Sequence, residues 1–164
     1  MTHDEAVKAI EIYREHFAVK GLFENKVYEG VEDLLLSLKK NSKKLILATS
    51  KPGVFADRIL EHFNLMKYFD LTIGSELNGD RIKKADVIAY ALEKAGIENT
   101  SDCVMVGDRC HDIDGAKKNN IETIGVTYGY GSFDELTNAG AEHIVNSVSE
   151  LEKLLIGGKL CPAQ

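Results

Sequence analysis

The sequence predicts an α/β fold with three layers, in which a mostly parallel sheet lies between two layers of helices. Short apolar runs alternate with amphipathic, helix-like runs from residue 43 to residue 155. Strands that are joined by helices lie parallel, and right-handed connections place those helices on both faces of the sheet. The length of 164 residues, 44% of them hydrophobic, fits one domain with a sizeable core.

The chain opens with two predicted helices. Apolar residues recur at helical spacing through residues 4–19, and a loop-like stretch separates them from a second helix at residues 31–40, which stops at Asn41. The first strand is predicted at residues 43–50. Pro52 follows it at a position where the first turn of a helix tolerates a missing N–H, so the next helix is predicted from there to residue 63. Only the helix at residues 4–19 stands outside the alternation.

The rest of the chain repeats the strand–helix unit. Strands are predicted at residues 69–75, 102–108, 122–127 and 142–146, and helices at residues 84–95, 112–120, 133–140 and 147–155. Asn78 and Gly79 form a turn signal, and Gly96 has the position of a glycine that ends a helix. We expect the tail, residues 157–164, to fray.

Composition and charge exclude several functions. The net charge is −6 and the lysines are scattered among glutamates, so the chain has no basic patch for nucleic acid. The sequence has no apolar run of the roughly 20 residues that span a bilayer, and its start does not resemble a signal peptide. We therefore expect a cytoplasmic protein without a membrane partner. Cys103, Cys110 and Cys161 are odd in number and form no C-x-x-C pair, which argues against a disulfide framework or a zinc site.

Polar side chains occur where three predicted strands end. Thr49 and Ser50 end one strand, Asp108 and Asp112 follow another, and Lys84 opens the helix after a third. Ligands of doubly wound sheets bind beyond the carboxyl ends of the strands, because the connecting turns gather there. We therefore expect these five residues to lie at one end of the sheet.

These residue types suit a phosphate group and a divalent cation. A hydroxyl such as that of Thr49, next to free N–H groups at a helix start, suits a phosphate oxygen, and the Lys84 ammonium supplies a compact positive charge. Two acids four residues apart offer hard oxygen ligands, and Mg²⁺ takes one or two carboxylates together with substrate phosphate. Each residue also has a structural alternative, because the hydroxyls could cap a helix, the lysine could be solvated and the acids could complement a helix dipole.

Three other features near these residues are given weaker roles. His111 lies between the two acids, but it has no evident partner and is expected to be exposed. Arg109 is expected to brace the turn rather than to bind substrate. The glycine loop "YGYGS", residues 128–132, lacks the G-x-G-x-x-G spacing, so a dinucleotide-binding domain is disfavoured.

Three stretches, "LILATSKP", "KKADVIAYAL" and "VMVGDRCHDIDGAKKNNI", resemble the second, third and fourth motifs of the haloacid dehalogenase superfamily. The likeness is greatest to the phosphoglycolate phosphatase-like branch. The resemblance implies a Rossmann-like fold and an Mg²⁺-dependent phosphatase that acts on a small phosphorylated metabolite. By position it implies that Thr49 binds the transferring phosphate, that Lys84 is the motif lysine and that Asp108 is a magnesium ligand. Asp112 would support the metal, directly or through water.

The resemblance also implies a division of the chain. Residues 1–26 resemble the last cap helix of such phosphatases with its linker, residues 27–156 the core domain, and residues 157–164 a tail. The first core strand of the family, which ends in D-x-D-G-T and carries the nucleophile and the general acid, has no counterpart in these 164 residues. That strand lies between the ones that correspond to residues 44–49 and 103–106. We therefore expect these two segments to be neighbouring parallel strands, either paired or one strand-width apart.

No other aspartate can replace the nucleophile. Asp70 and Asp102 begin strands, Asp80 lies in a turn, and the D-G pair at Asp114 lies inside the last motif. A nucleophile has to sit at the carboxyl end of a strand and face the phosphate. The chain is therefore expected to be the C-terminal part of a phosphatase that is inactive alone. The alternative is a short protein that binds phosphate or metal without turnover, or an interaction module.

Overall fold

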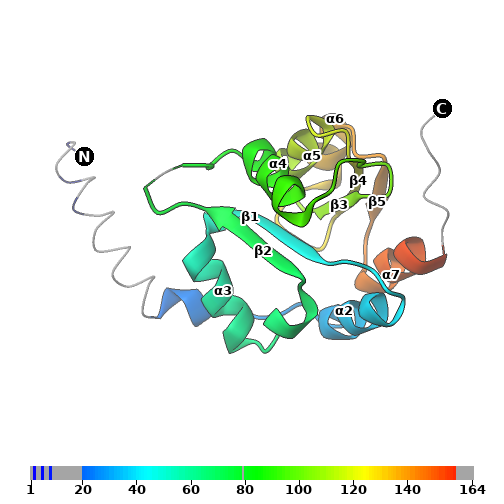
Figure 1. Ribbon diagram of the computed structural model, residues 1–164, viewed down its shortest axis with the longest axis horizontal. Coiled ribbons are helices and arrows are strands. Elements are labelled where there is room, and N and C mark those ends of the chain that lie inside the picture. The colour runs from blue at the N-terminus through cyan, green and yellow to red at the C-terminus, as the bar shows by residue number, and fades with distance from the viewer. Residues whose placement is uncertain (1, 3–4, 6–7, 9–19, 79, 158–164) are drawn as a thin grey trace.

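The computed structural model describes residues 2, 5, 8, 20–78 and 80–157 (Figure 1). Its elements are, in order, η1 (Gly21–Phe23), α2 (Val31–Lys40), β1 (Ile46–Pro52), α3 (Gly53–His62), η2 (Met66–Tyr68), β2 (Leu71–Ser75), α4 (Lys84–Ala95), β3 (Val104–Gly107), α5 (Cys110–Lys117), β4 (Glu122–Val126), α6 (Phe133–Ala139), β5 (His143–Val145) and α7 (Val148–Gly157). Strands and helices alternate as predicted. The helix predicted at residues 4–19 and the tail from residue 158 lie outside the described residues, apart from residues 5 and 8.

Two predicted boundaries were wrong for local reasons. Pro52 does not open α3. It ends β1 with an extended backbone, at φ −53° and ψ 132°, and serves as the residue before the helix. Helix α5 begins at Cys110 rather than at Asp112, because the Asp112 carboxylate accepts a hydrogen bond from the Arg109 N–H and so caps the turn that precedes it. Gly96 does end α4 in the left-handed conformation, at φ 66°, as predicted.

The described strands form two parallel sheets instead of one. β1 pairs with β2, and β3, β4 and β5 pair in that order. Within the described part of the chain, no ladder joins β1 to β3. The predicted sheet is therefore interrupted, and the interruption falls at the position where the motif comparison implies a missing strand.

Helices cover both faces of these sheets. Figure 1 shows α4, α5 and α6 on one side of the strands and α2, α3 and α7 on the other. Successive side chains of β1 point to opposite layers. Leu47 packs against a cluster of buried side chains that includes Leu60 of α3, whereas Ala48 packs against a cluster that includes Ile88 of α4. This arrangement confirms the three-layer α/β class. Among the described residues, none of the helices has the length and apolar character needed to cross a membrane.

A cavity of about 620 Å³ lies where the two sheets face each other. Residues 46–48 of β1 line one side of it and residues 104–106 of β3 line the other. The two segments are thus not directly paired, and they share one cavity. Of the two predicted arrangements, the structure has the one in which a gap separates the strands.

Candidate active site

Lys84 links the ends of the two sheets. It is the first residue of α4, and its ammonium donates to the Ala48 carbonyl at 2.9 Å and lies 2.8 Å from Asp112 Oδ1. The side chains of the ion pair are only 13% and 10% exposed. Gly115 makes room for it, because a Cβ there would come within 2.8 Å of the Lys84 Cγ. Since Ala48 lies in β1 and Asp112 lies in α5, directly after β3, Lys84 links β1 to the segment that follows β3.

Asp112 holds the turn after β3. It is 7% exposed, and its Oδ2 accepts hydrogen bonds from the backbone N–H groups of Asp108 at 3.2 Å and Arg109 at 3.1 Å. A Cβ at Gly107 would overlap the Asp112 side chain, so only glycine fits there. Both carboxylate oxygens therefore have protein partners, and Asp112 acts first as a structural acid that fixes the position of Asp108.

Asp108 keeps one oxygen for a ligand. Its Oδ2 accepts a hydrogen bond from the Tyr130 N–H at 2.8 Å, whereas Oδ1 accepts none from the residues that the structure describes. The loop 128–132 packs tightly on it, since a Cβ at Gly129 would overlap the Asp108 side chain and one at Gly131 would overlap its carbonyl oxygen. Sequence reasoning treated this glycine loop as a weak signal. Its function is to let the backbone approach and orient the acid.

Thr49 and Ser50 lie beside the lysine contact, with different partners. The Thr49 Oγ1 accepts a hydrogen bond from the Lys51 N–H at 3.2 Å, so its own proton is available to another acceptor. The Ser50 side chain is exposed, and its carbonyl accepts from the Ser75 hydroxyl at 2.9 Å, which ties the end of β1 to the end of β2. The structure thus brings Lys84 and Asp108 each into contact with Asp112 and places Thr49 next to Ala48, whose carbonyl accepts from Lys84.

The residues between the two acids have the supporting positions expected of them. Arg109 braces the turn, because its Nε donates to Glu135 Oε1 at 2.8 Å, and the same oxygen accepts from the Cys110 N–H at 2.9 Å. His111 is exposed. Sequence reasoning did not identify Glu135, which reaches the turn from α6. A hydrogen bond from the Cys110 N–H, followed by one from Arg109, lowers the Glu135 pKa to about 2.

The lowered Glu135 pKa predicts an acid-dependent contribution to stability. A carboxylate with a depressed pKa in the folded state stabilises the fold above its unfolded pKa of 4.5, and this contribution is lost as the pH falls toward about 2. We therefore expect the difference in unfolding free energy between the wild type and Glu135→Gln to shrink between pH 5 and pH 2.5. Urea unfolding at several pH values measures it. A difference that stays constant over this range contradicts the assigned role.

The acids at this site fit a magnesium ion better than a closed metal centre. Among the described residues no group of three or more His, Cys, Asp and Glu side chains could hold a metal. Magnesium needs only one or two protein carboxylates, because it keeps several waters and takes substrate oxygens. The Asp108 Oδ1 meets this requirement, and Asp112 adds negative charge next to it.

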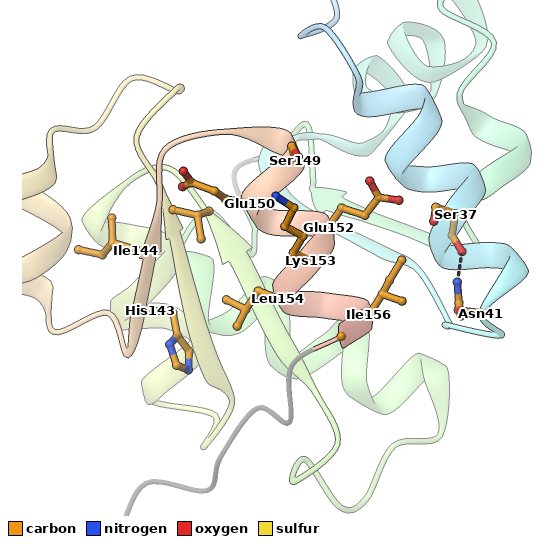
Figure 2. Close-up of a pocket in the computed structure, with 12 residues that line it drawn as sticks. Ser37, Asn41, His143, Ile144, Ser149, Glu150, Glu152, Lys153, Leu154 and Ile156 are labelled. Atoms are coloured by element: carbon orange, nitrogen blue, oxygen red, sulfur yellow. Dashed lines mark hydrogen bonds between the residues drawn. The ribbon is translucent and has the colours of Figure 1, made fainter.

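Another hollow of the surface does not include these residues. It has a volume of about 980 Å³ and lies between α7, β5 and α2. Figure 2 shows its lining residues, among them His143, Glu152 and Ser37, none of which comes from the carboxyl-end turns. His143 is engaged there with Glu122 at 3.2 Å. The candidate site is therefore the convergence at Lys84.

Exposed apolar side chains occur in several segments that follow strands. Val54 is the second residue of α3, Leu77 and Ile82 lie between β2 and α4, and Tyr130 and Phe133 follow β4, with exposed fractions between 52% and 88%. Their segments all follow the carboxyl end of a strand.

Comparisons with known proteins match most of the chain. A model of the family described as haloacid dehalogenase-like hydrolase matches residues 2–126. A 5'-nucleotidase of Pseudomonas aeruginosa is 42% identical, and the match covers 92% of this chain and 67% of that protein. Tyrosine-protein kinase PtkA of Mycobacterium tuberculosis is 34% identical over 93% of this chain and 53% of PtkA. A phosphoglycolate phosphatase of Colwellia psychrerythraea is 31% identical over 87% of this chain and 63% of that enzyme.

The fold also matches solved structures. A predicted phosphatase from Clostridium acetobutylicum is 53% identical and superposes with a TM-score of 0.89, over 96% of this chain and 72% of that protein. The chain spans 53–67% of the length of the three relatives named above.

Proposed function

We propose that this chain, which belongs to the haloacid dehalogenase-like hydrolase family, supplies the phosphate- and magnesium-binding part of a phosphatase site. The substrate class proposed is a small phosphate monoester. One observation carries the proposal. The buried Lys84 ammonium lies against Asp112 and the Ala48 carbonyl, next to an Asp108 carboxylate that has one oxygen available for a ligand.

Each residue of the site has a proposed task. Lys84 offsets the negative charge of the phosphoryl group and of the attacking carboxylate, and the Thr49 hydroxyl donates to a phosphate oxygen. Asp108 holds Mg²⁺ through its open oxygen, while Asp112 keeps the Asp108 turn and the Lys84 ammonium in place. The ion, when bound, neutralises charge on the transferring phosphate.

The proposed reaction needs an attacking carboxylate that these 164 residues do not offer. In the proposed chemistry an aspartate oxygen forms a bond to phosphorus as the bond from phosphorus to the ester oxygen breaks, and the departing alcohol takes a proton from a general acid. Water then attacks the aspartyl-phosphate and releases inorganic phosphate. The chain alone would therefore bind ligand and metal without turnover.

The relatives support a small substrate without selecting one. Their names include a nucleotidase, a phosphoglycolate phosphatase and a tyrosine kinase, all of which handle phosphoryl groups. Because exposed apolar side chains occur in the segments that follow the strand ends, we propose that residues of these segments select the rest of the substrate. We also propose action in the cytoplasm, where phosphorylated metabolites are found.

Magnesium titration of the chain tests the metal role. We expect isothermal titration calorimetry to detect binding to the wild type and a loss of at least about tenfold in affinity for Asp108→Asn, because an amide replaces a charged ligand. Asp114→Asn is the matched control, since Asp114 is an exposed acid of α5, the helix that follows Asp108. Equal affinity of Asp108→Asn and wild type would rule out Asp108 as a ligand.

A further inference from the structure

One face of α5 contacts the start of α4 at several points. Asp112 pairs with the Lys84 ammonium at 2.8 Å, and a Cβ at Gly115 would come within 2.8 Å of the Lys84 Cγ. The Asn119 side chain, two residues past the end of α5, donates to the Ala85 carbonyl at 3.0 Å. The spacing of three and then four residues places Asp112, Gly115 and Asn119 on one side of the helix. We name these three residues the α5 face.

The orientation of the Asn119 amide is fixed by two acceptors. Its Nδ2 donates to the Ala85 carbonyl and also to the Gly115 carbonyl, which lies at 2.8 Å. Carbonyl oxygens only accept hydrogen bonds, and Nδ2 carries the only donors of this side chain, so the amide fits in this orientation alone. The side chain is half-buried. Asn119 thus ties the second residue of α4 to the last turn of α5.

The first turn of α4 begins without a side-chain cap. Its N-cap residue, Lys83, makes no side-chain cap hydrogen bond within the described part of the chain. The turn starts with hydrogen bonds from the Asp86 and Val87 N–H groups to the Lys83 carbonyl. Uncapped helix starts fray easily, and the backbone of Lys84 moves with this turn. The contacts of the α5 face therefore hold the lysine in place of a cap.

We propose that Asn119 is a positioning residue for Lys84. By tying Ala85 to α5, it keeps the Lys84 ammonium at the point where the phosphoryl group binds. The inference rests on the proposed function, because it assigns Asn119 to the same phosphate site. Asn119 lies in the stretch that resembles the fourth motif, "VMVGDRCHDIDGAKKNNI", but sequence reasoning gave it no role.

One helix then positions both members of the ion pair. α5 carries Asp112 in its first turn, and through Asn119 it holds the segment to which Lys84 belongs. A displacement of about 1 Å is enough to weaken the action of a charged group on its ligand. A hydrogen bond that does not touch the ligand can therefore still set the affinity for phosphate.

The metal-binding half of the site is held by other contacts. The Asp108 N–H donates to Asp112 Oδ2, and the Asp108 carboxylate accepts from the Tyr130 N–H. These partners belong to α5 and to the loop after β4, and neither lies in α4. Loss of the Asn119 contact should thus weaken phosphate binding and leave Mg²⁺ binding unchanged.

A purely local role for Asn119 makes a different prediction. Its bond to the Gly115 carbonyl satisfies one of the carbonyls that a helix leaves free at its end. If Asn119 served only α5, its removal would lower the stability of the fold, but phosphate and Mg²⁺ would bind the folded protein as before. Asn119→Ser separates the two roles, because a serine hydroxyl can donate to the carbonyl four residues earlier but is too short to reach Ala85.

Ligand titrations of the full chain, followed by NMR spectroscopy, test the proposal. The probes are inorganic phosphate in the presence of Mg²⁺, and Mg²⁺ alone. We expect Asn119→Ala and Asn119→Ser to bind phosphate roughly 3- to 10-fold more weakly than the wild type, which is the effect of one hydrogen bond. Their affinity for Mg²⁺ should stay within about twofold of the wild type. Asn138→Ala, which replaces an exposed asparagine of α6, is the control and should leave both affinities unchanged.

Amide hydrogen exchange gives a second readout that needs no ligand. In Asn119→Ser the Asp86 and Val87 amides should exchange about tenfold faster, whereas the amide of Ala91, later in α4, should change by less than about twofold. The serine variant also keeps the test decisive if Asn119→Ala does not fold. Phosphate affinity and exchange equal to those of the wild type, or a parallel loss of phosphate and Mg²⁺ affinity, would overturn the positioning role. A wild type that binds no phosphate overturns the proposed function and the inference with it, so the two failures are distinguishable.

Discussion

The chain alone is expected to show no turnover of p-nitrophenyl phosphate with Mg²⁺, whereas the same chain preceded by an apolar strand ending in D-x-D-G-T is expected to hydrolyse it. Transfer through an aspartyl intermediate requires the attacking carboxylate itself. Lys84 and a metal at Asp108 stabilise charge, but they cannot replace the bond that forms. Because enzymes exceed the uncatalysed rate by about a millionfold or more, the two forms should differ by at least about 1,000-fold.

Two substitutions control this comparison. Asparagine in place of the first aspartate of the added strand should return the longer form to the rate of the short one, because it removes the nucleophile and keeps the strand. Asp108→Asn should also inactivate the longer form. Robust hydrolysis by the short form that disappears in Asp108→Asn would mean that a nucleophile lies within the 164 residues and that the proposed division of the site is wrong.

Local sequence signals predicted the elements around the site well. Helix α4 was predicted to begin at Lys84 and to stop at Gly96, and both positions are correct because helical periodicity and a left-handed glycine are encoded within the segment itself. The convergence of Lys84, Asp108 and Asp112 was also predicted, since strand ends of a parallel sheet meet at one edge. The family inferred from the motifs is confirmed by the match to residues 2–126.

Features that depend on distant contacts were not predictable. The loop 128–132 reads as an ordinary glycine loop, and only its packing on Asp108, some twenty positions earlier in the chain, reveals why Gly129 and Gly131 cannot carry a side chain. The same holds for Glu135, whose partners Arg109 and Cys110 belong to another helix–strand unit. Their helical or loop character follows from local sequence, whereas their role follows from the fold.

The split of the sheet depends on both local sequence and distant contacts. Each strand was identified from its own apolar run, but the pairing of a strand depends on which neighbour is present. β1 and β3 remain unpaired because no other described strand lies between them, and helices cover both faces of the two sheets. Open apolar edges of this kind favour pairing with another chain or aggregation. The unpaired edges of β1 and β3 are therefore a liability for the chain.

Removal of the Lys84 charge is expected to destabilise the fold as well as the site. Lys84→Met leaves the Asp112 carboxylate, 7% exposed, without its cation, and breaking such a buried pair costs on the order of 3–5 kcal/mol. The double substitution with Asp112→Asn should recover part of this loss, because it removes the uncompensated charge, and the asparagine side-chain oxygen can still accept from the Arg109 N–H. Lys83→Met, at the exposed neighbouring position, should change stability by no more than about 0.5 kcal/mol. Urea unfolding of five proteins measures these effects: the wild type, Lys84→Met, Asp112→Asn, the double variant and Lys83→Met. If Lys84→Met costs no more than Lys83→Met, or if the double variant is as unstable as the two single losses combined, the ion pair is not what joins β1 to the turn after β3. The lysine would then have to be explained by ligand binding alone.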